Sequence, residues 1–243
     1  MILGVIPARY GSTRFPGKAL ARIGGKPLVQ RVWEQARKAK RLDRLVVATD
    51  DPRILEAVKQ MGGEGIMTSS DLPSGTDRVW AAARTTAAEV ILNLQGDEPL
   101  LQPEMVDRLA EVLARDPGVA MATLRFPTAD PQGYADPNVV KVVADSEGWA
   151  LYFSRSPIPF NRAGGAVPSP WYKHLGMYGY RRELLEQFVR WPVSALEKTE
   201  GLEQLRALEH GVRIKVVDSP WDTIGVDTPE DLKRVEAILK SHA

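Results

Sequence analysis

The sequence contains no cysteine among its 243 residues. This absence excludes a disulfide framework, a thiolate nucleophile and a zinc site built from cysteines. The sequence also lacks an excess of charge, because 32 lysines and arginines stand against 31 aspartates and glutamates. Proteins that bind nucleic acids or membrane surfaces usually carry a basic excess. We therefore expect no nucleic-acid partner and no charged membrane-binding surface.

Long hydrophobic runs are also missing. No stretch approaches the roughly 20 apolar residues of a membrane span. The first residues, Met1 to Pro7, lack the basic and long apolar segments of a secretory signal. These absences favour a cytoplasmic protein with no membrane insertion. Because 44% of the residues are hydrophobic, the chain can bury one substantial core, which favours a single domain over residues 1–243 with an appended lobe.

Apolar runs and helical periodicity alternate over residues 1–118. Three runs rich in apolar and β-branched residues are typical of strands buried on both faces: 2–6, 45–49 and 90–94. Three prolines stand where helices are expected to begin: Pro27 at a first helical position, Pro52 and Pro103. This alternation predicts an α/β fold with a Rossmann-like, doubly wound, mostly parallel sheet and right-handed crossovers.

The pattern changes near residue 119. Four strand-like segments follow without helices between them: 119–126, 139–143, 150–153 and 175–180. They predict an appended lobe of antiparallel hairpins over residues 119–218. Gly164-Gly165, with prolines close by, predicts an exposed flexible loop that could cover a site or meet a partner subunit. Helical spacing returns from Leu202. It returns again from Leu232, which lies in the third and last part of the domain, residues 219–243.

Three cations follow the first predicted strand, in a loop that also contains glycine and serine. They are Arg9, Arg14 and Lys18. Glycines such as Gly11 and Gly17 can bring backbone N–H groups close to an anion. Because open α/β sheets bind ligands at the ends of their strands, the loop is interpreted as a polyphosphate site. An ordinary surface loop rich in arginine and glycine is the alternative.

Two better-known phosphate motifs do not fit this loop. A Walker loop has four residues between its first glycine and Gly-Lys, whereas Gly11 and Gly17 enclose five, and Ala19 stands where serine or threonine would hold magnesium. A dinucleotide fingerprint requires Gly-x-Gly-x-x-Gly, but Arg9 and Tyr10 occupy its tight turn. A P-loop kinase is therefore disfavoured.

Two later loops contain acidic residues that are candidates for binding a metal ion. Asp97, in Gln95-Gly-Asp-Glu-Pro99, stands at the end of a predicted strand, where it can hold a divalent cation beside a triphosphate or merely cap a turn. Asp227 precedes Thr228, which is predicted to cap the last helix, so Asp227 is not required as the cap. Asp222 is a rival for the same role, and the residues alone leave that choice open.

Motifs at the N-terminus carry a family resemblance. Ile6-Pro-Ala-Arg9, Ser12-Thr-Arg14 and Pro16-Gly-Lys18 resemble the opening of the CMP-sugar-acid synthetases. Family members commonly carry leucine where this chain has Phe15, which keeps an apolar side chain. The resemblance continues almost to the C-terminus. It implies a nucleotide-diphospho-sugar transferase-like fold and a reaction in which a sugar acid attacks CTP and releases pyrophosphate.

The resemblance also implies roles for residues of the first and last parts. It makes Asp97 and Asp227 ligands of Mg²⁺, and these two with Arg9 and Lys18 the catalytic set. Further nucleotide-binding residues are implied as a group: Ala8, Arg9, Ser12, Arg14, Lys18, Ser74, Gly75 and Arg78. From the residues alone, Ser74-Gly-Thr-Asp77-Arg78 is a weak helix start, in which the glycine permits close approach and Arg78 can reach a phosphate or a base.

The second half is expected to bind the sugar acid. The resemblance implies 3-deoxy-manno-octulosonate (Kdo), a component of lipopolysaccharide, and a homodimer joined through the lobe. The implied contacts are Arg155 for the carboxylate and, for hydroxyl groups, His174, Tyr178, Glu203 and Gln204. Without the resemblance, these residues would be taken as a solvated helix face and structural hydrogen bonds.

Other functions remain open at this point. Within the same fold the acceptor can be sialic acid or a sugar 1-phosphate. A nucleotide-binding module without catalysis is an alternative of a different class. No general base is assigned, because magnesium can lower the pKa of a hydroxyl that it binds. Neither the number of magnesium ions nor the order of substrate binding follows from the sequence.

Overall fold

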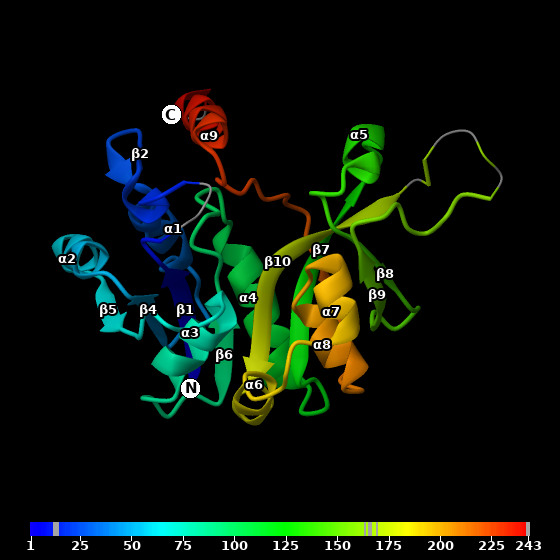
Figure 1. Cartoon of the computed structure of the whole chain (residues 1–243), viewed down its shortest axis with the longest axis horizontal. Helices are drawn as coiled ribbons and strands as arrows, with labels where there is room; N and C mark the ends of the chain where they lie inside the picture. Colours follow the sequence, from blue (N-terminus) through cyan, green and yellow to red (C-terminus); the bar gives the residue numbers. More distant parts are fainter. Residues whose placement is uncertain (12–14, 163, 165–166, 169, 242–243) are drawn as a thin grey trace. The chain divides into compact units, whose positions relative to one another are not determined.

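The computed structural model describes residues 1–11, 15–162, 164, 167–168 and 170–241. Contacts within the chain group these residues into two units (Figure 1). Unit 1 comprises Met1–Ala110 and Thr223–Ala243, whereas unit 2 comprises Glu111–Asp222. The chain therefore returns to unit 1 at Thr223, and Asp227 belongs with the N-terminal segments. No helix in the described ranges is long and apolar enough to cross a membrane.

Unit 1 is built on a parallel sheet with β1 in its interior. Its strands, in order across the sheet, are β6 (Val90–Asn93), β1 (Ile2–Ala8), β4 (Arg44–Thr49) and β5 (Glu64–Met67). Residues 3–6 of β1 are all buried, as expected for a strand covered on both faces. The predicted mixed α/β fold with a largely parallel sheet is confirmed.

Helices and short elements complete unit 1. They are η1 (Lys18–Leu20), β2 (Arg22–Ile23), β3 (Lys26–Pro27), α1 (Leu28–Ala36), α2 (Pro52–Gln60), α3 (Gly75–Ala83), α9 (Pro229–Ser241) and α4 (Pro103–Arg115), which continues into unit 2. Helix α9 lies near β2 in Figure 1. Val235 of α9 belongs to an apolar cluster with Ile23 and Leu28. This cluster fixes the segment that leads into α9.

The start of α1 differs from the prediction. Pro27 does not occupy the first helical position but precedes the helix, with an extended ψ of 146°. The reason is that Pro27 pairs with Arg22 in the small β2–β3 ladder, which requires an extended backbone. The helix then buries Leu28 and Val32 on one face, as its periodicity predicts.

Unit 2 combines antiparallel and parallel strands. These are β7 (Met121–Thr128), β8 (Lys141–Ala144), β9 (Ala150–Ser154), β10 (Trp171–Arg181) and β11 (Ile214–Asp218). β8 and β9 form an antiparallel hairpin, and β10 pairs antiparallel with both β7 and β8. However, β11 runs parallel to β7, so the lobe is not made of antiparallel hairpins alone. The helices α6 (Arg182–Phe188), α7 (Ala195–Glu200) and α8 (Gln204–Glu209) precede β11.

A helix also interrupts the strands that were expected to follow one another directly. Helix α5 (Pro131–Ala135) lies between β7 and β8. The carboxylate of Asp130 accepts hydrogen bonds from the backbone N–H groups of Gln132 and Gly133, and proline stands at the first helical position. Of the loop expected at Gly164-Gly165, Gly164 is exposed with a φ of 71°, and Gly165 lies outside the described residues.

A buried lysine organises the neighbouring loops of unit 2. The side chain of Lys141, on β8, is fully buried, and its Nζ donates to the carbonyl oxygens of Asp136, Val139 and Arg155 at 2.9, 2.7 and 2.6 Å. Burial lowers the pKa of this ammonium group. Because all three N–H donors have acceptors, Lys141 ties the loop after α5 to the end of β9.

Candidate active site

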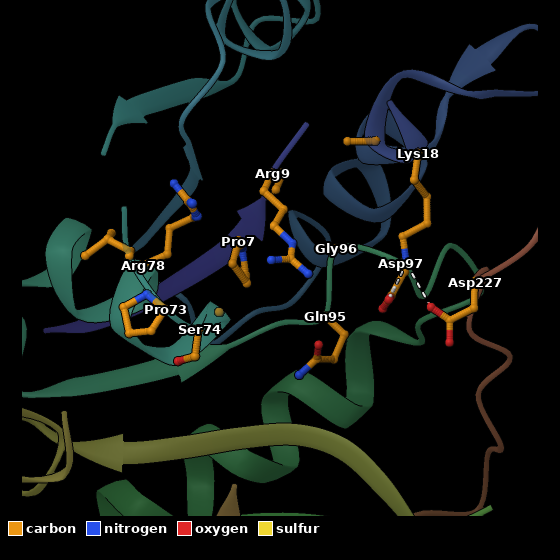
Figure 2. Close-up of a pocket in the computed structure, with 14 residues that line it drawn as sticks. Pro7, Arg9, Lys18, Pro73, Ser74, Arg78, Gln95, Gly96, Asp97 and Asp227 are labelled. Carbon is orange, nitrogen blue, oxygen red and sulfur yellow. Dashed lines mark hydrogen bonds and ion pairs between the residues drawn. The ribbon is translucent and has the colours of Figure 1, made fainter. Parts of the chain in front are cut away.

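A pocket opens at the carboxyl ends of β1 and β6 in unit 1 (Figure 2). It holds about 280 Å³. Its lining consists of Pro7, Ala8, Arg9, Lys18, Ala19, Leu72, Pro73, Ser74, Gly75, Arg78, Gln95, Gly96, Asp97 and Asp227. The pocket thus brings together residues that are up to 220 positions apart, Pro7 to Asp227. Ligands bind to open α/β sheets at this edge.

One cation and two carboxylates meet at one end of this pocket. The Nζ of Lys18 lies 2.8 Å from Oδ2 of Asp97 and 3.1 Å from Oδ1 of Asp227. Figure 2 shows the three side chains pointing toward one another from separate segments. Their side chains are 16, 30 and 42% exposed, so a ligand in the pocket can reach them. The convergence expected of these three residues is present within unit 1.

Asp227 is oriented by the start of α9. Thr228 Oγ1 accepts a hydrogen bond from the backbone N–H of Asp231, and Asp231 Oδ2 accepts in return from the N–H of Thr228. This confirms Thr228 as the helix cap, so that the Asp227 carboxylate is not used for capping. The N–H of Val226 also donates to the carbonyl oxygen of Asp97 at 2.8 Å. That bond fixes the two acidic loops beside each other.

Asp222 has a different partner. Its Oδ1 accepts a hydrogen bond from Nζ of Lys173 at 2.7 Å, and both residues belong to unit 2. Asp227, by contrast, lines the pocket and contacts Lys18. The geometry therefore favours Asp227 over Asp222 as the second acidic residue beside Asp97.

The loop that carries Lys18 turns at Gly17. This glycine has a φ of 70°, and its N–H donates to the carbonyl oxygen of Tyr10 at 3.0 Å. A β-carbon at this position would also lie 3.3 Å from the Tyr10 ring. The turn directs Lys18 toward the pocket at the start of η1. Ser12 and Arg14, which were predicted to bind the nucleotide, lie outside the described residues.

The loop that carries Asp97 approaches β1 very closely at Gly96. A β-carbon on Gly96 would lie 2.5 Å from the carbonyl oxygen of Pro7. Because that contact is with backbone, no side-chain rotation can relieve it. The absence of a side chain therefore allows the Asp97 loop to cross the end of β1.

We expect Gly96→Ala to lower the free energy of unfolding by about 1–3 kcal/mol, as other overpacked sites do. Urea denaturation followed by circular dichroism measures this change. Gly225→Ala is the matched control, because a β-carbon there meets no atom within 4 Å. Equal stability of the two variants would contradict the proposed role of Gly96.

Arg78 is held in the pocket wall by a buried ion pair. It lies on α3, which Ser74 caps by accepting from the backbone N–H of Asp77. The Arg78 side chain is 3% exposed, and its Nη2 donates to Oδ2 of Asp50 at 2.9 Å. Oδ1 of Asp50 accepts from the backbone N–H of Tyr10 at 3.2 Å. Asp50 thus connects Arg78 to the start of the cationic loop.

Asp50→Asn should therefore destabilise the protein. The substitution leaves the buried Arg78 charge without its carboxylate, which typically costs about 3 kcal/mol. Urea unfolding measures the loss. Asp51→Asn is the control, because its partner Arg53 is 58% exposed and asparagine also caps helices, so we expect a change below about 0.5 kcal/mol. Similar losses in both variants would argue against a special role for Asp50.

Ala8 is the last residue of β1, and Arg9 follows it at the edge of the pocket. Ala8 is buried, whereas Arg9 is exposed and its side chain extends into the pocket in Figure 2. Sequence reasoning did not identify Leu72, Pro73 and Gln95, although they line the same pocket. Gln95 shares the Gln-Gly-Asp-Glu-Pro segment with Asp97, and this proximity in sequence is the signal that could have found it.

Four residues predicted to bind the sugar acid belong to unit 2, and three of them, His174, Tyr178 and Glu203, act on one another there. The rings of His174 and Tyr178 lie 5.5 Å apart, and the charge of Glu203 acts on Tyr178. Burial lowers the pKa of His174 to about 3, and desolvation raises the pKa of Tyr178 well above its ordinary value. The rings of His174 and Tyr178 are therefore neutral at physiological pH. The Nε2 of Gln204 is a buried donor with no acceptor in the part of unit 2 that the structure describes.

Arg155 contacts the backbone of its surroundings. Its guanidinium donates to the carbonyl oxygens of Glu200, Pro137 and Gly201 at 2.6, 2.9 and 3.4 Å. The Glu200 carboxylate accepts from the backbone N–H of Arg155 at 2.9 Å. These bonds hold the end of β9 against the end of α7. The structure alone thus gives Arg155 a structural role, and its binding of a carboxylate stays a prediction.

Comparisons with known proteins identify the family of this chain. The family model described as Cytidylyltransferase matches residues 3–214 of the chain. A 3-deoxy-manno-octulosonate cytidylyltransferase from Syntrophobacter fumaroxidans is 53% identical, covering 100% of this chain and 98% of its own length. Another from Geobacter sulfurreducens is 51% identical, covering 98% of this chain and 99% of its own.

A solved structure is also similar over the whole chain. It is that of CMP:2-keto-3-deoxy-manno-octonic acid synthetase complexed with CTP. Its TM-score is 0.94 at 42% identity, and the match covers 100% of this chain and 99% of the other. The resemblance indicated by the N-terminal motifs is therefore confirmed. The chain belongs to the cytidylyltransferase family, whose members are nucleotidyltransferases.

Proposed function

We propose that this protein transfers CMP from CTP to Kdo and releases pyrophosphate, which supplies an activated sugar acid for lipopolysaccharide synthesis. The observation that carries this proposal is the meeting of Lys18, Asp97 and Asp227 in one pocket. The names of the relatives, which are Kdo cytidylyltransferases at about half identity, support the choice of substrates.

The nucleotide is proposed to bind in the pocket of unit 1. Its triphosphate carries about four negative charges, which cations must offset before a nucleophile can approach. Lys18 and Arg9 line the pocket and supply two such charges, and Arg14 is proposed as a third. Ala8, Ser74 and Gly75 line the same pocket with Arg78 and are proposed to contact the nucleoside.

The acidic pair is suited to hold Mg²⁺. Magnesium usually takes one or two carboxylates and completes its shell with phosphate oxygens and water. Asp97 and Asp227 provide two carboxylates that already share one cation, the Lys18 ammonium, in this structure. Larger groups of acidic or histidine ligands do not occur among the described residues. When bound, Mg²⁺ would neutralise phosphate charge and lower the pKa of a hydroxyl group.

In the reaction, a hydroxyl oxygen of the sugar acid attacks the α-phosphorus of CTP. A new P–O bond forms, the bond to the pyrophosphate oxygen breaks, and the proton of the hydroxyl group is released. Lys18 and Arg9 stabilise the charge that develops on the phosphate oxygens. No histidine lines the described pocket, and we assign no side chain as general base.

The sugar acid is proposed to bind to unit 2. Neutral His174 and Tyr178 and the Gln204 amide provide hydrogen-bonding groups for hydroxyls, with Glu203 as a further acceptor. Arg155 is proposed to meet the carboxylate of the sugar acid. We also propose a homodimer formed through unit 2, where Phe160 is 84% exposed, and a cytoplasmic location.

A pyrophosphate-release assay with each of the common nucleoside triphosphates, with and without Kdo, tests the proposal. We expect release with CTP and Kdo together, and little with CTP alone or with ATP. Sialic acid and a sugar 1-phosphate serve as acceptor controls. Binding of CTP without any release would identify a non-catalytic module, and release with another acceptor but not with Kdo would contradict the substrate assignment.

A further inference from the structure

A bulge in the β7–β10 ladder surrounds the Thr123 hydroxyl. Leu175 pairs with Leu124, but the next paired residue on β10 is Tyr178, which lies opposite Thr123. The carbonyl oxygens of Leu175 and Met177 consequently face Oγ1 of Thr123, at 3.2 and 2.8 Å. Thr123 is fully buried. Bulges of this kind turn backbone groups away from the ladder and often occur beside functional sites.

The Thr123 hydroxyl also contacts an imidazole nitrogen. Nε2 of His174 lies 3.0 Å from Oγ1 of Thr123. A threonine hydroxyl has one hydrogen to donate and lone pairs that accept, whereas a carbonyl oxygen can only accept. Because Oγ1 stands 2.8 Å from the Met177 carbonyl oxygen, its hydrogen must lie on that contact. The contact between Oγ1 and His174 Nε2 then needs its hydrogen from Nε2, so Nε2 is the donor and Oγ1 the acceptor.

This proton assignment determines the other ring nitrogen. A neutral imidazole carries one N–H, so a protonated Nε2 leaves Nδ1 as an acceptor. Nδ1 of His174 has no hydrogen-bond partner in the described part of the chain. The ring is packed against Phe153, at 4.8 Å between centroids, and against Tyr178. Burial lowers the pKa of His174, and the charge of Glu203 acts on the neighbouring Tyr178.

We propose that Thr123 is a positioning residue that holds His174 as the Nε2–H tautomer, so that Nδ1 accepts a hydrogen bond from a hydroxyl of the sugar acid. This inference rests on the proposed function for the identity of the ligand. A second observation points to a ligand in this part of unit 2. Gln204 has a buried amide donor that lacks an acceptor among the described residues. It follows Glu203 in the sequence, and the charge of Glu203 acts on Tyr178, whose ring packs against His174. Thr123 was not identified from the sequence.

The tautomer is tested by ¹⁵N NMR on the wild-type enzyme labelled at its three histidines. The resonances that disappear in His174→Gln identify His174. We expect Nε2 to resonate as a protonated nitrogen and Nδ1 as an unprotonated nitrogen. Addition of Kdo should shift the Nδ1 resonance toward that of a hydrogen-bonded acceptor, with little change at Nε2. A proton on Nδ1, or an Nδ1 resonance unaffected by Kdo in an enzyme that consumes Kdo, overturns the inference.

Substitutions of Thr123 separate positioning from a purely structural role. Thr123→Ser keeps the hydroxyl and should retain the wild-type KM for Kdo. Thr123→Val removes it, and we expect the KM for Kdo to rise about tenfold while the KM for CTP is unchanged. An unchanged KM for Kdo in a folded Val variant overturns the inference. If that variant does not fold, the wild-type NMR result decides.

Failure of the proposed function gives a different pattern of results. In that case Kdo supports no pyrophosphate release, although His174 still carries its proton on Nε2. The assignment of the His174 tautomer would then be retained, and the ligand that binds to Nδ1 would have to be a compound other than Kdo. Release of pyrophosphate with Kdo together with a proton on Nδ1 would instead retain the function and refute the role of Thr123.

Discussion

The Asp97→Asn variant is expected to fold normally and to turn over at less than about one hundredth of the wild-type rate. Asparagine keeps the shape of the side chain but removes the charge that contacts Lys18 at 2.8 Å. It also removes one of the two carboxylates proposed to hold Mg²⁺. The turnover number is measured by pyrophosphate release during a magnesium titration, and circular dichroism reports the fold.

Asp222→Asn is the matched control for this experiment. Asp222 is paired with Lys173 and is not among the residues that line the pocket. Its replacement should change turnover by less than about threefold, because it removes an ion pair whose carboxylate is 41% exposed. Near-normal turnover of Asp97→Asn at high magnesium, or an equal loss in both variants, would remove Asp97 from the mechanism.

Lys18→Met should reduce kcat/KM for CTP by about 100- to 1,000-fold. Methionine keeps a long side chain but removes the ammonium group, which the proposal directs to the triphosphate in the transition state. That reduction corresponds to a loss of about 3–4 kcal/mol of transition-state stabilisation. Steady-state kinetics with varied CTP and saturating Kdo measures it.

Lys26→Met provides the comparison for Lys18. Lys26 pairs with Glu34, its side chain is 44% exposed, and it does not line the pocket. We expect its kcat/KM to stay near that of the wild type, because exposed ion pairs contribute little. A Lys18→Met enzyme that retains more than about a third of the wild-type kcat/KM would show that the triphosphate does not depend on this cation.

The sequence predicted β1, β4 and β6 of unit 1 but not β5. β1, β4 and β6 each contain an apolar run, which is typical of strands buried on both faces. β5, which pairs with β4, escaped prediction because its four residues include Glu64 and Gly65 and none of them is buried. Its backbone is held by that pairing rather than by a local pattern.

Unit 2 was predicted less completely because its pairings are not local. β11 joins β7 in parallel although α6, α7 and α8 and several strands lie between them in sequence. Strand runs alone do not state which neighbour a strand will take or in which direction. Helix α5 was missed because it is a single short turn, stabilised by the Asp130 cap more than by any apolar periodicity.

For the site, residue chemistry and position after a buried strand favoured the cationic loop, whereas the choice of both Asp97 and Asp227 as metal ligands came from the family resemblance. The predicted cap at Thr228 is confirmed, so the Asp227 carboxylate is not needed to cap α9. Asp50 could not be found in this way. Its importance depends on the burial of Arg78, 28 positions away, and burial of a charged residue has no signature in sequence.

The convergence of Lys18, Asp97 and Asp227 on one metal–nucleotide complex is tested most directly by crystals grown with CTP and Mn²⁺. We predict an anomalous-scattering peak within coordination distance of one oxygen of each carboxylate and of the triphosphate, with the Lys18 ammonium moved onto a phosphate oxygen. A metal bound by phosphates and water alone, with Lys18 still between the two carboxylates, would contradict the account.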